Sequence, residues 1–429
     1  MRTVNRFCIL VLVTLLAACG GGDETESTKT SSKSELATYL SPQNDMLELN
    51  PFSQYNPPIP DFQNKTIRQV AHISVGGDGI KIRLSNEYGT TPLTLDKVRV
   101  SKSLGKGTVD LSSDTAVLFS GREQVTIPPG AEIASDEVPI RLASLNDLAV
   151  SIYVKQASAR TQHRGSNTTT YFGDGDLTSS ANIPNAQTIT SGFFVSQISV
   201  IRQNKANVVV AFGDSITEGA VTPKDANLSW PNQLSAIVNA RTETSVVNAG
   251  IGGNAWVKNT SGPCGLCRFQ RDVLNVPGVT HVVLALGIND IGLGYFYANT
   301  YNDASWVVTS KQITDSIQAA IDAAKAKGLK VYGTTLLPFK GAFYYTSGQP
   351  TEIPAGMSAP YDGEQVRQSV NAFVRTNPSL DGVIDLDRIM QDPSNPLSQR
   401  IEWNAGDYLH PNATGNVQIA EAVNLVVFK

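Results

Sequence analysis

The sequence predicts an all-β domain followed by an α/β domain that contains a parallel sheet. Residues 61–203 consist of short alternating runs separated by turn residues at spacings of about ten residues, which is typical of a β-sandwich. From residue 204 onward, apolar strands alternate with segments of helical period. That alternation indicates right-handed crossovers and a sheet covered by helices on both faces.

The N-terminus, residues 1–18, is built like a signal peptide. Two arginines precede the apolar run from Phe7 to Ala18, which is too short to span a bilayer. The sequence Leu-Ala-Ala before Cys19 resembles the lipobox of bacterial lipoproteins, in which the signal is cleaved before the cysteine and the thiol is acylated. The resemblance implies a lipid anchor on Cys19 and a place in the bacterial cell envelope, at the outer membrane because Gly20 follows. An ordinary secretory signal before an incidental cysteine is the alternative.

Residues 19–60 are rich in Gly, Ser, Thr, Asp and Glu, then in Pro, and have no hydrophobic period. This composition predicts a solvated tether between the lipid and the folded part. The formal net charge is -4 and no block of Lys and Arg stands out, so a nucleic-acid surface is excluded. The membrane, reached through the lipid on Cys19, is an expected partner.

Two further cysteines, Cys264 and Cys267, lie in the stretch PCGLCR. A structural zinc site needs four ligands, and no second Cys or His pair has suitable spacing. Outside the cytoplasm we expect a local disulfide that pins one loop, with reduced thiols as the alternative.

The two predicted domains differ in their runs. Residues 61–203 are expected to form a jelly-roll-like β-sandwich from runs such as RQVAHISV, GIKIRLSN, KVRVSKS, LAVSIYV and FFVSQISVI. Residues 204–429 hold the apolar strands ANVVVAF, SVVNAG, HVVLALG, KVYGTTLLP and GVIDL. The helical segments are SWVVTSKQITDSIQAAIDAAKAKG, GEQVRQSVNAFVRTN and TGNVQIAEAVNLVVF. Functional groups of such a parallel sheet collect at the carboxyl ends of its strands.

Four short motifs lie where chemistry is expected. GDS follows VVVAF, NAGIGGN follows SVV, GIND follows HVVLAL, and DYLH precedes the last helical segment. Together they resemble the four blocks of the SGNH or GDSL hydrolase family, in the same order. The resemblance implies a flavodoxin-like three-layer domain and a serine esterase. It extends to a bacterial subgroup that has an N-terminal β-domain and includes acyl and acetylxylan esterases. Ile216 stands where the family name has Leu, a change between apolar residues.

The residues explain the chemistry independently of the family. A serine hydroxyl needs a base, and a turn from strand to helix presents Ser215 at the rim of the sheet. Among the four histidines of the chain, His410 has Asp407 three residues before it. That spacing on a turn lets the carboxylate hold the imidazole tautomer, so His410 is the candidate base and Asp407 its orienting partner.

Ester cleavage also creates an oxyanion that donors must meet. The resemblance implies three of them: the backbone N–H of Ser215, that of Gly253 and the side-chain amide of Asn289. Gly253 suits this role because a residue without Cβ lets its backbone approach a substrate closely. Asn289 supplies an uncharged N–H that does not compete with His410 for the proton.

Other hydrolase signatures are missing from the sequence. There is no G-x-S-x-G elbow, and the S-x-x-K at Ser103–Lys106 has neither S-D-N nor K-T-G beside it. There is no H-E-x-x-H, so no metal or other cofactor is required.

The sequence therefore predicts an esterase for short acyl groups, with acetylated polysaccharide as the favoured substrate. Two alternatives remain. One is a lipase or arylesterase, and the other is a surface glycan-binding lipoprotein whose hydrolase is vestigial. Aromatic residues after the motifs fit a sugar platform, an acyl pocket or the core equally well.

Overall fold

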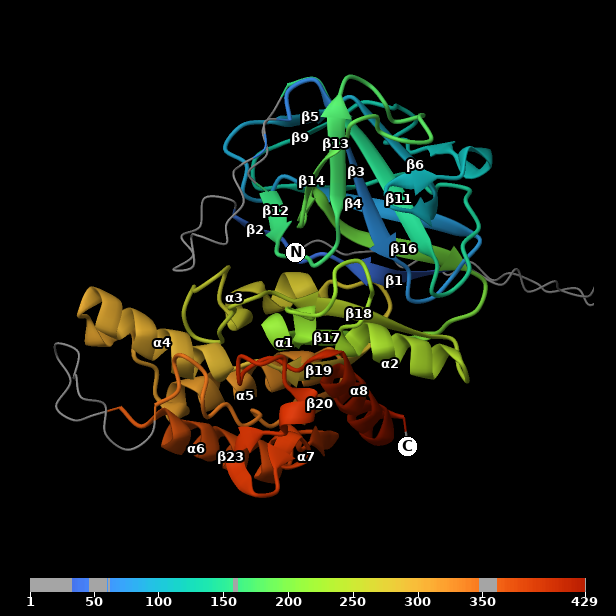
Figure 1. Cartoon of the computed structure of the whole chain (residues 1–429). Coiled ribbons are helices and arrows are strands. Elements are labelled where there is room, and N and C mark those ends of the chain that lie inside the picture. The colour runs from blue at the N-terminus through green and yellow to red at the C-terminus, as the bar shows by residue number, and fades with distance from the viewer. Residues whose placement is uncertain (1–32, 46–59, 61, 157–160, 347–360, 429) are drawn as a thin grey trace, which may run out of the picture. The chain divides into compact units, whose positions relative to one another are not determined.

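The computed structural model describes residues 33–45, 60, 62–156, 161–346 and 361–428 (Figure 1). The predicted signal peptide and Cys19 lie outside these ranges. Lys33–Lys429 group as one compact unit by their contacts. Within the described ranges, no helix combines the length and apolar character needed to cross a membrane.

The N-terminal part of this unit is built from antiparallel strands. One sheet has the order β1-β16-β4-β10, and a second has the order β14-β13-β3-β11-β6-β7 with β8 also paired to β6. A smaller sheet has the order β15-β12-β2, and β5 pairs with β9. The strands are β1 Ser34–Leu40, β2 Asn44–Asp45, β3 Lys65–His72, β4 Gly79–Ser85, β5 Leu93–Leu95, β6 Lys97–Gly105, β7 Thr108–Val109, β8 Thr115–Ala116, β9 Val125–Ile127, β10 Glu132–Ala134, β11 Asp147–Val154, β12 Thr161–Arg164, β13 Thr170–Asp174, β14 Gln187–Ile189, β15 Ser191–Phe193 and β16 Val195–Arg202.

Alternation along these strands produces the core of the β-domain. In β4, Ile80, Ile82 and Leu84 are fully buried, while Lys81 and Arg83 between them are partly exposed. Phe62 lies edge-on to Phe193 with ring centroids 4.7 Å apart. Period-two burial on paired strands is what the sequence pattern predicts.

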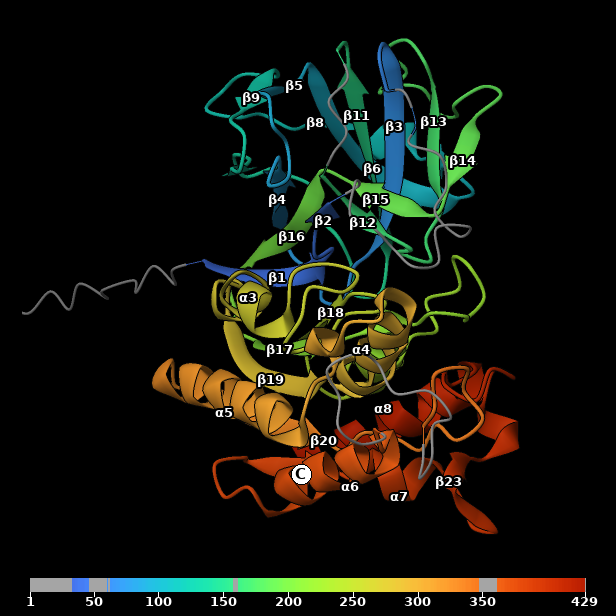
Figure 2. The same ribbon diagram turned by 90° about the vertical axis from the view of Figure 1, so that its left-hand side faces the viewer.

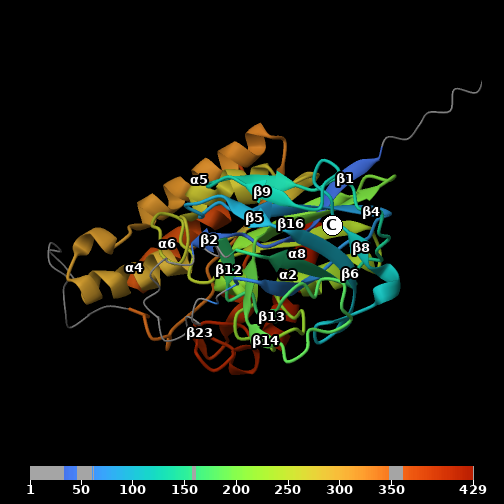
Figure 3. The ribbon, with the colours of Figure 1, turned by 90° about the horizontal axis from the view of Figure 1, so that it is seen from above.

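The tether prediction for residues 19–60 is wrong for β1. This segment pairs antiparallel with β16 (Figure 3). Its Leu36 and Ala37 are buried. The N–H of Ala37 donates to Pro277 O at 2.9 Å, and the Ser245 hydroxyl donates to Ala37 O at 2.6 Å. A single short strand with polar flanks carries no visible period, so only its pairing and packing partners decide that it is ordered.

The C-terminal part holds the parallel sheet, whose strand order is β18-β17-β19-β20-β21. Its strands are β17 Asn207–Gly213, β18 Thr244–Gly250, β19 Val279–Ala285, β20 Lys330–Thr334 and β21 Gly382–Ile384, and the short β22 Gln391–Asp392 and β23 Asn395–Gln399 pair with each other outside it. This is the flavodoxin-like order 2-1-3-4-5. Val208, Val209 and Val210 of β17 are fully buried, as expected for a strand covered on both faces.

Helices cover this sheet. They are α1 Ser215–Glu218, α2 Trp230–Asn239, α3 Gly265–Phe269, α4 Ile288–Tyr301, α5 Ser310–Ala326, α6 Gly363–Thr376, α7 Leu386–Met390 and α8 Ala413–Val427, with a π turn at Gln270–Leu274 and 3-10 turns at Ala304–Trp306 and Ile401–Trp403. A further 3-10 turn, Leu111–Ser113, lies in the β-domain. α2 packs with α8, and α5 packs with α6 (Figures 1 and 2). The predicted α/β architecture of this part is confirmed.

The strand order fixes where a site can form. The chain moves from β17 outward to β18 and then crosses back to β19 on the other side of β17. The direction of winding therefore reverses between β17 and β19, and ligands of open parallel sheets bind at the carboxyl ends of strands at such a point. Ser215 follows β17 and Asn289 follows β19, so both lie at this switch point.

Candidate active site

Ser215 is the first residue of α1, which begins directly after β17. Asp214 is the N-cap, and its Oδ1 accepts a hydrogen bond from the Ile216 N–H at 3.0 Å. Burial raises the pKa of Asp214 to about 7, against the opposing effects of that hydrogen bond and of the nearby His410. The GDS motif therefore works locally as a cap that turns the chain and places Ser215 at the rim of the sheet.

Ser215 and His410, 195 residues apart in sequence, meet at this rim. Ser215 Oγ lies 2.8 Å from His410 Nε2, and His410 Nδ1 lies 2.6 Å from Asp407 Oδ2. Both distances are within hydrogen-bond reach. If Nδ1 carries its hydrogen toward the carboxylate, Nε2 is free to accept the proton of the serine hydroxyl. The structure thus brings together the three residues predicted as nucleophile, base and orienting acid.

The loop before α8 holds Asp407 in place. Its Oδ1 accepts the backbone N–H groups of His410 at 2.8 Å and Leu409 at 3.0 Å, while Oδ2 faces the imidazole. Burial alone would raise the pKa of Asp407, but the hydrogen bond and charge of His410 and the two backbone N–H groups lower it to about 2. Asp407 is therefore ionised at any pH at which an esterase works, and its Oδ2 can accept the hydrogen of His410 Nδ1.

Gly253, the second predicted oxyanion donor, lies in the loop after β18. Gly253 has φ of 73°, a left-handed conformation that favours glycine. Within the described part of the chain, the N–H groups of Ser215 and Gly253 donate to no other group. An oxyanion site requires N–H donors that are not already bonded within the protein.

Asn289, the third predicted donor, lies in the first turn of α4 and is 3% exposed. One amide N–H donates to Asn254 O at 3.0 Å, and its Oδ1 accepts a hydrogen bond from the Tyr344 hydroxyl at 3.3 Å. These two bonds fix the orientation of the amide and leave its second N–H available. Tyr344 was not singled out for this role by the sequence, because its partner is 55 residues away.

Arg268 is a further residue that the sequence analysis missed. Its guanidinium is fully buried and donates to Gly213 O at 2.7 Å, to Ala249 O at 2.9 Å and to Asn254 Oδ1 at 2.9 Å. It therefore ties together the ends of β17 and β18 and the loop that carries Gly253. A neighbouring carboxylate, Asp272, accepts at 3.0 Å. The only sequence signal was its place in the quoted PCGLCR.

Two other features hold the same loop. Cys264 and Cys267, at the start of α3, are joined by a disulfide directly before Arg268. Asp290 accepts the backbone N–H groups of Trp256 at 2.7 Å and Val257 at 2.9 Å. Burial raises the pKa of Asp290 to about 7, although these two hydrogen bonds oppose the shift.

The other three histidines of the chain have partners outside the Ser215–His410–Asp407 contacts. His72 pairs with Asp147, 2.7 Å away, and His281 bonds Thr280 within β19. His163 is buried in β12. In the described ranges no group of three or more His, Cys, Asp or Glu side chains could hold a metal ion.

The aromatic residues that follow the motifs are mostly part of the core. Trp256, Tyr297, Phe339 and Tyr344 are buried, whereas Phe343 is 61% exposed. Most of these rings therefore stabilise the fold, and Phe343 presents its ring to solvent.

Comparison with known proteins gives one family match and several similar solved structures. Residues 211–417 match the GDSL-like Lipase/Acylhydrolase family. No curated protein matches the chain in sequence. Similar solved structures include a GDSL-like lipase from Bacteroides thetaiotaomicron, with 19% identity, TM-score 0.34 and coverage of 52% of this chain and 85% of that one.

Two more solved structures extend the comparison. The acetyl xylan esterase AlAXEase has 21% identity and TM-score 0.36, and the match covers 51% of this chain and 99% of that one. The SGNH-hydrolase family esterase AlinE4 has 16% identity and TM-score 0.32, with 52% and 96% covered. The match over residues 211–417 identifies this part of the chain as a GDSL-like lipase/acylhydrolase domain, which is a carboxylic ester hydrolase domain.

Proposed function

We propose that the chain is a serine esterase in which Ser215 is the nucleophile, His410 the general base and Asp407 the residue that orients His410. The observation that carries this proposal is the continuous pair of contacts from Ser215 Oγ to His410 Nε2 and from His410 Nδ1 to Asp407 Oδ2. A hydroxyl, an imidazole and an ionised carboxylate in that order are the parts of a serine hydrolase.

The reaction follows from these roles. Ser215 Oγ attacks the acyl carbonyl carbon while its proton passes to His410 Nε2. As the tetrahedral intermediate collapses, the bond to the alcohol breaks and the alcohol takes the proton from His410. A water molecule then attacks the acyl-serine and loses a proton to His410. The second tetrahedral intermediate collapses, the bond between the acyl carbon and Ser215 Oγ breaks, His410 returns the proton to Oγ, and the carboxylic acid leaves.

The oxyanion of each tetrahedral intermediate is stabilised, in this proposal, by the N–H groups of Ser215 and Gly253 and the free amide N–H of Asn289. The support is that both backbone N–H groups are unused in the described part of the chain and that Asn289 is held by Asn254 and Tyr344. Donors that are already oriented do not have to reorganise during the reaction.

For the substrate, we propose short acyl esters, and acetyl groups on a polysaccharide in particular. The support is the sequence resemblance to a subgroup that includes acetylxylan esterases. The exposed ring of Phe343 adds an apolar surface of the kind on which a sugar ring stacks.

Hydrolysis of p-nitrophenyl acetate by the purified protein tests the mechanism. Ser215→Ala should abolish it, whereas Ser245→Ala, a buried serine that bonds Ala37 O, serves as the matched control. Equal rates in wild type and Ser215→Ala would overturn the proposal. Comparing acetate with octanoate esters, and then acetylated with deacetylated xylan, tests the substrate, since a preference for octanoate would favour a lipase instead.

We also propose that the protein is lipid-anchored through Cys19 in the cell envelope. The lipobox-like sequence supports this, and a polymer outside the cytoplasm would be accessible from there. Membrane fractionation of cells that express wild type or Cys19→Ala tests it. The wild type should sediment with membranes and the variant should be released, and identical distribution would contradict the anchor.

A further inference from the structure

The segment that follows α1 is held by the β-domain. Residues 163–169, which begin in β12, face residues 218–225, which begin at the end of α1. We call residues 163–169 the clasp and residues 218–225 the nucleophile turn. The nucleophile turn is bonded to Ser215 itself, because the N–H groups of Gly219 and Ala220 both donate to Ser215 O, at 3.0 and 2.9 Å.

Asn167 makes the central contacts of the clasp. Its amide donates to Thr222 O at 3.0 Å, to Thr222 Oγ1 at 2.8 Å and to Gly219 O at 3.3 Å. In return, the N–H of Asp225 donates to Asn167 O at 3.1 Å. Thr169 bonds the Asp225 carboxylate twice, through its N–H and its hydroxyl, both at 2.6 Å. The clasp therefore fixes the backbone of the nucleophile turn at both of its ends.

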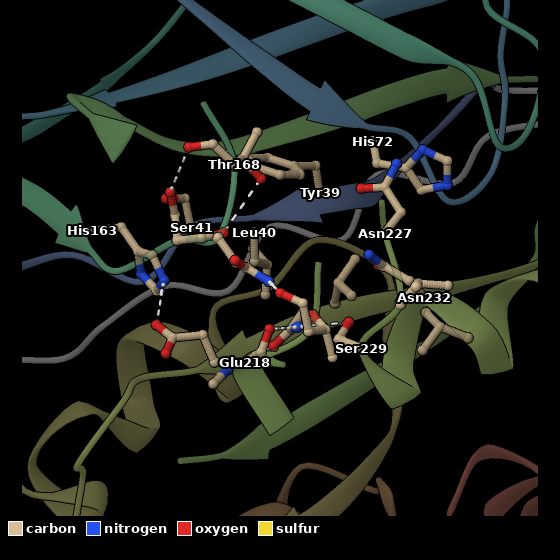
Figure 4. Close-up of a pocket in the computed structure, with 18 of the residues that line it drawn as sticks. Tyr39, Leu40, Ser41, His72, His163, Thr168, Glu218, Asn227, Ser229 and Asn232 are labelled. Atoms are coloured by element: carbon tan, nitrogen blue, oxygen red, sulfur yellow. Dashed lines mark hydrogen bonds and ion pairs between the residues drawn. The ribbon is translucent and has the colours of Figure 1, made fainter. Parts of the chain in front are cut away.

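His163 adds a buried side-chain contact at the base of the clasp. Its Nδ1 lies 2.6 Å from Pro42 O, so Nδ1 must carry the hydrogen, because a carbonyl can only accept. Its Nε2 lies 3.0 Å from Glu218 Oε1, and the two side chains are 7% and 6% exposed (Figure 4). Glu218 Oε1 accepts no hydrogen bond in the described part of the chain, so the two side chains are in close contact without a hydrogen bond between them. The pair thus links β12 to the last residue of α1.

Glu218 also touches the loop of the predicted oxyanion donors. A Cβ at Gly252 would lie 2.7 Å from Glu218 Oε2, so this carboxylate is packed between His163 and the residue before Gly253. A polar cavity of about 80 Å³, lined by the clasp, the nucleophile turn and β1, lies beside it. Holding Glu218 in place therefore affects both the nucleophile side and the oxyanion side of the site.

The nucleophile turn contains a conformation that needs support. Val221 has φ of 62° and is 56% exposed. A β-branched residue in this region is strained, and such strain persists only where surrounding contacts impose it. Because the Val221 side chain is exposed, packing does not hold Val221 in this conformation. The hydrogen bonds from Asn167 to Gly219 and Thr222 instead hold the residues on either side of Val221.

We propose that the clasp is a positioning element of the esterase, and that the β-domain supplies it through Asn167, Thr169 and His163. The inference rests on the proposed function, and it assigns the β-domain a part in the reaction of the other domain. None of these three residues touches substrate. They act through the nucleophile turn, whose displacement would move Ser215 relative to His410 and the oxyanion donors.

The main test is Asn167→Gly in the full chain. Glycine keeps the left-handed backbone of Asn167, whose φ is 52°, and removes only the side chain. We expect kcat for p-nitrophenyl acetate to fall about tenfold or more with KM unchanged, because small misplacements of reacting groups are costly. Thr169→Val and His163→Leu should lower kcat in the same way, and His163→Gln, which retains an N–H donor, should recover most of it.

The matched control is Ser74→Ala. Ser74 Oγ also bonds the other domain, at 2.7 Å to Ser235 Oγ and 2.7 Å to the Val246 N–H, but away from the nucleophile turn. This variant should lose some stability and keep kcat. The two variants are compared in their unfolding midpoint and in kcat. If Ser74→Ala and Asn167→Gly have the same midpoint and the same loss of kcat, the clasp is only a contact between domains and the inference is overturned.

Amide hydrogen exchange of residues 213–224 separates this inference from the proposed function. Loss of the Asn167 bonds should raise exchange in this peptide about tenfold in Asn167→Gly and leave it unchanged in Ser74→Ala. If the wild-type protein has no esterase activity, the proposed function is refuted but the clasp is not. Amide exchange in this peptide would then still test whether the clasp holds the nucleophile turn. Unchanged exchange in Asn167→Gly would refute the clasp whether or not the protein is active.

Discussion

Replacing Arg268 should lower kcat much more than it lowers stability, although Arg268 itself is not one of the proposed catalytic residues. Arg268→Met keeps much of the aliphatic volume and removes the donors to Gly213 O, Ala249 O and Asn254 Oδ1. It also removes one cation from Asp272, which keeps Arg271 as a partner at 2.6 Å. Breaking a buried ion pair lowers the free energy of unfolding by about 3 to 5 kcal/mol. We take the lower value, about 3 kcal/mol, because Asp272 keeps one cation, Arg271, as its partner. For a chain of this length that corresponds to roughly 3 °C in the unfolding midpoint.

The effect on the reaction should exceed the effect on folding. With the guanidinium gone, the ends of β17 and β18 and the loop of Gly253 lose their common anchor. A shift of about 1 Å in the oxyanion donors costs about 100-fold in rate, so kcat should fall by that order with KM little changed. Hydrolysis of p-nitrophenyl acetate well below the unfolding midpoint measures this.

Arg68 of the β-domain provides the matched control. It is also fully buried, and it donates to carbonyl groups that include Gly107 O at 2.8 Å and Ser180 O at 2.6 Å. Arg68→Met should lower the unfolding midpoint and preserve kcat in the fraction that is folded. If Arg268→Met keeps the wild-type kcat, or if both variants lose kcat to the same extent, the assigned role of Arg268 is wrong.

Three further predictions concern the site and its surroundings. Asn289→Ala should lower kcat by a factor on the order of 100, about 3 kcal/mol of transition-state stabilisation, with a small change in KM in the same ester assay. Folding raises the pKa of Asp214 to about 7, so its stabilising contribution is full below about pH 4 and is lost as the pH rises through 7. Asp214→Asn keeps the helix cap and should show a flatter dependence of unfolding midpoint on pH between 4 and 7, and an unchanged slope would refute the assignment. Reducing the Cys264–Cys267 disulfide, which closes a loop of sequence separation 3, should lower the free energy of unfolding by about 2 kcal/mol in guanidinium titrations with and without reductant. No change on reduction would contradict it.

Much of the site is local and could therefore be predicted. The turn at Asp214 and Ser215 follows from a buried strand that ends in glycine, a capping residue and the start of a helix. Asp407 and His410 are three residues apart, and one turn of loop is enough to bring carboxylate and imidazole together. The order of strands and helices along the chain likewise predicted the parallel sheet.

The misses have a different physical origin. β1 was assigned to a tether because a single strand has no period, and its order comes from pairing with β16. Arg268 and Tyr344 looked like ordinary residues of a loop and a core. Their partners are carbonyl and amide groups of distant segments, and such contacts leave no pattern in the sequence.

By itself the sequence determined which groups are available for chemistry, because each motif is set by spacing within a few residues of a strand end. The tertiary structure decided which of these groups meet. Ser215 reaches His410 across 195 residues because the winding reverses between β17 and β19 and α8 returns to pack beside α2. It also decided that Asn167 of the β-domain holds the nucleophile turn. Hydrogen bonds depend on positions to within a fraction of an ångström, and only the packing of the whole chain fixes those positions.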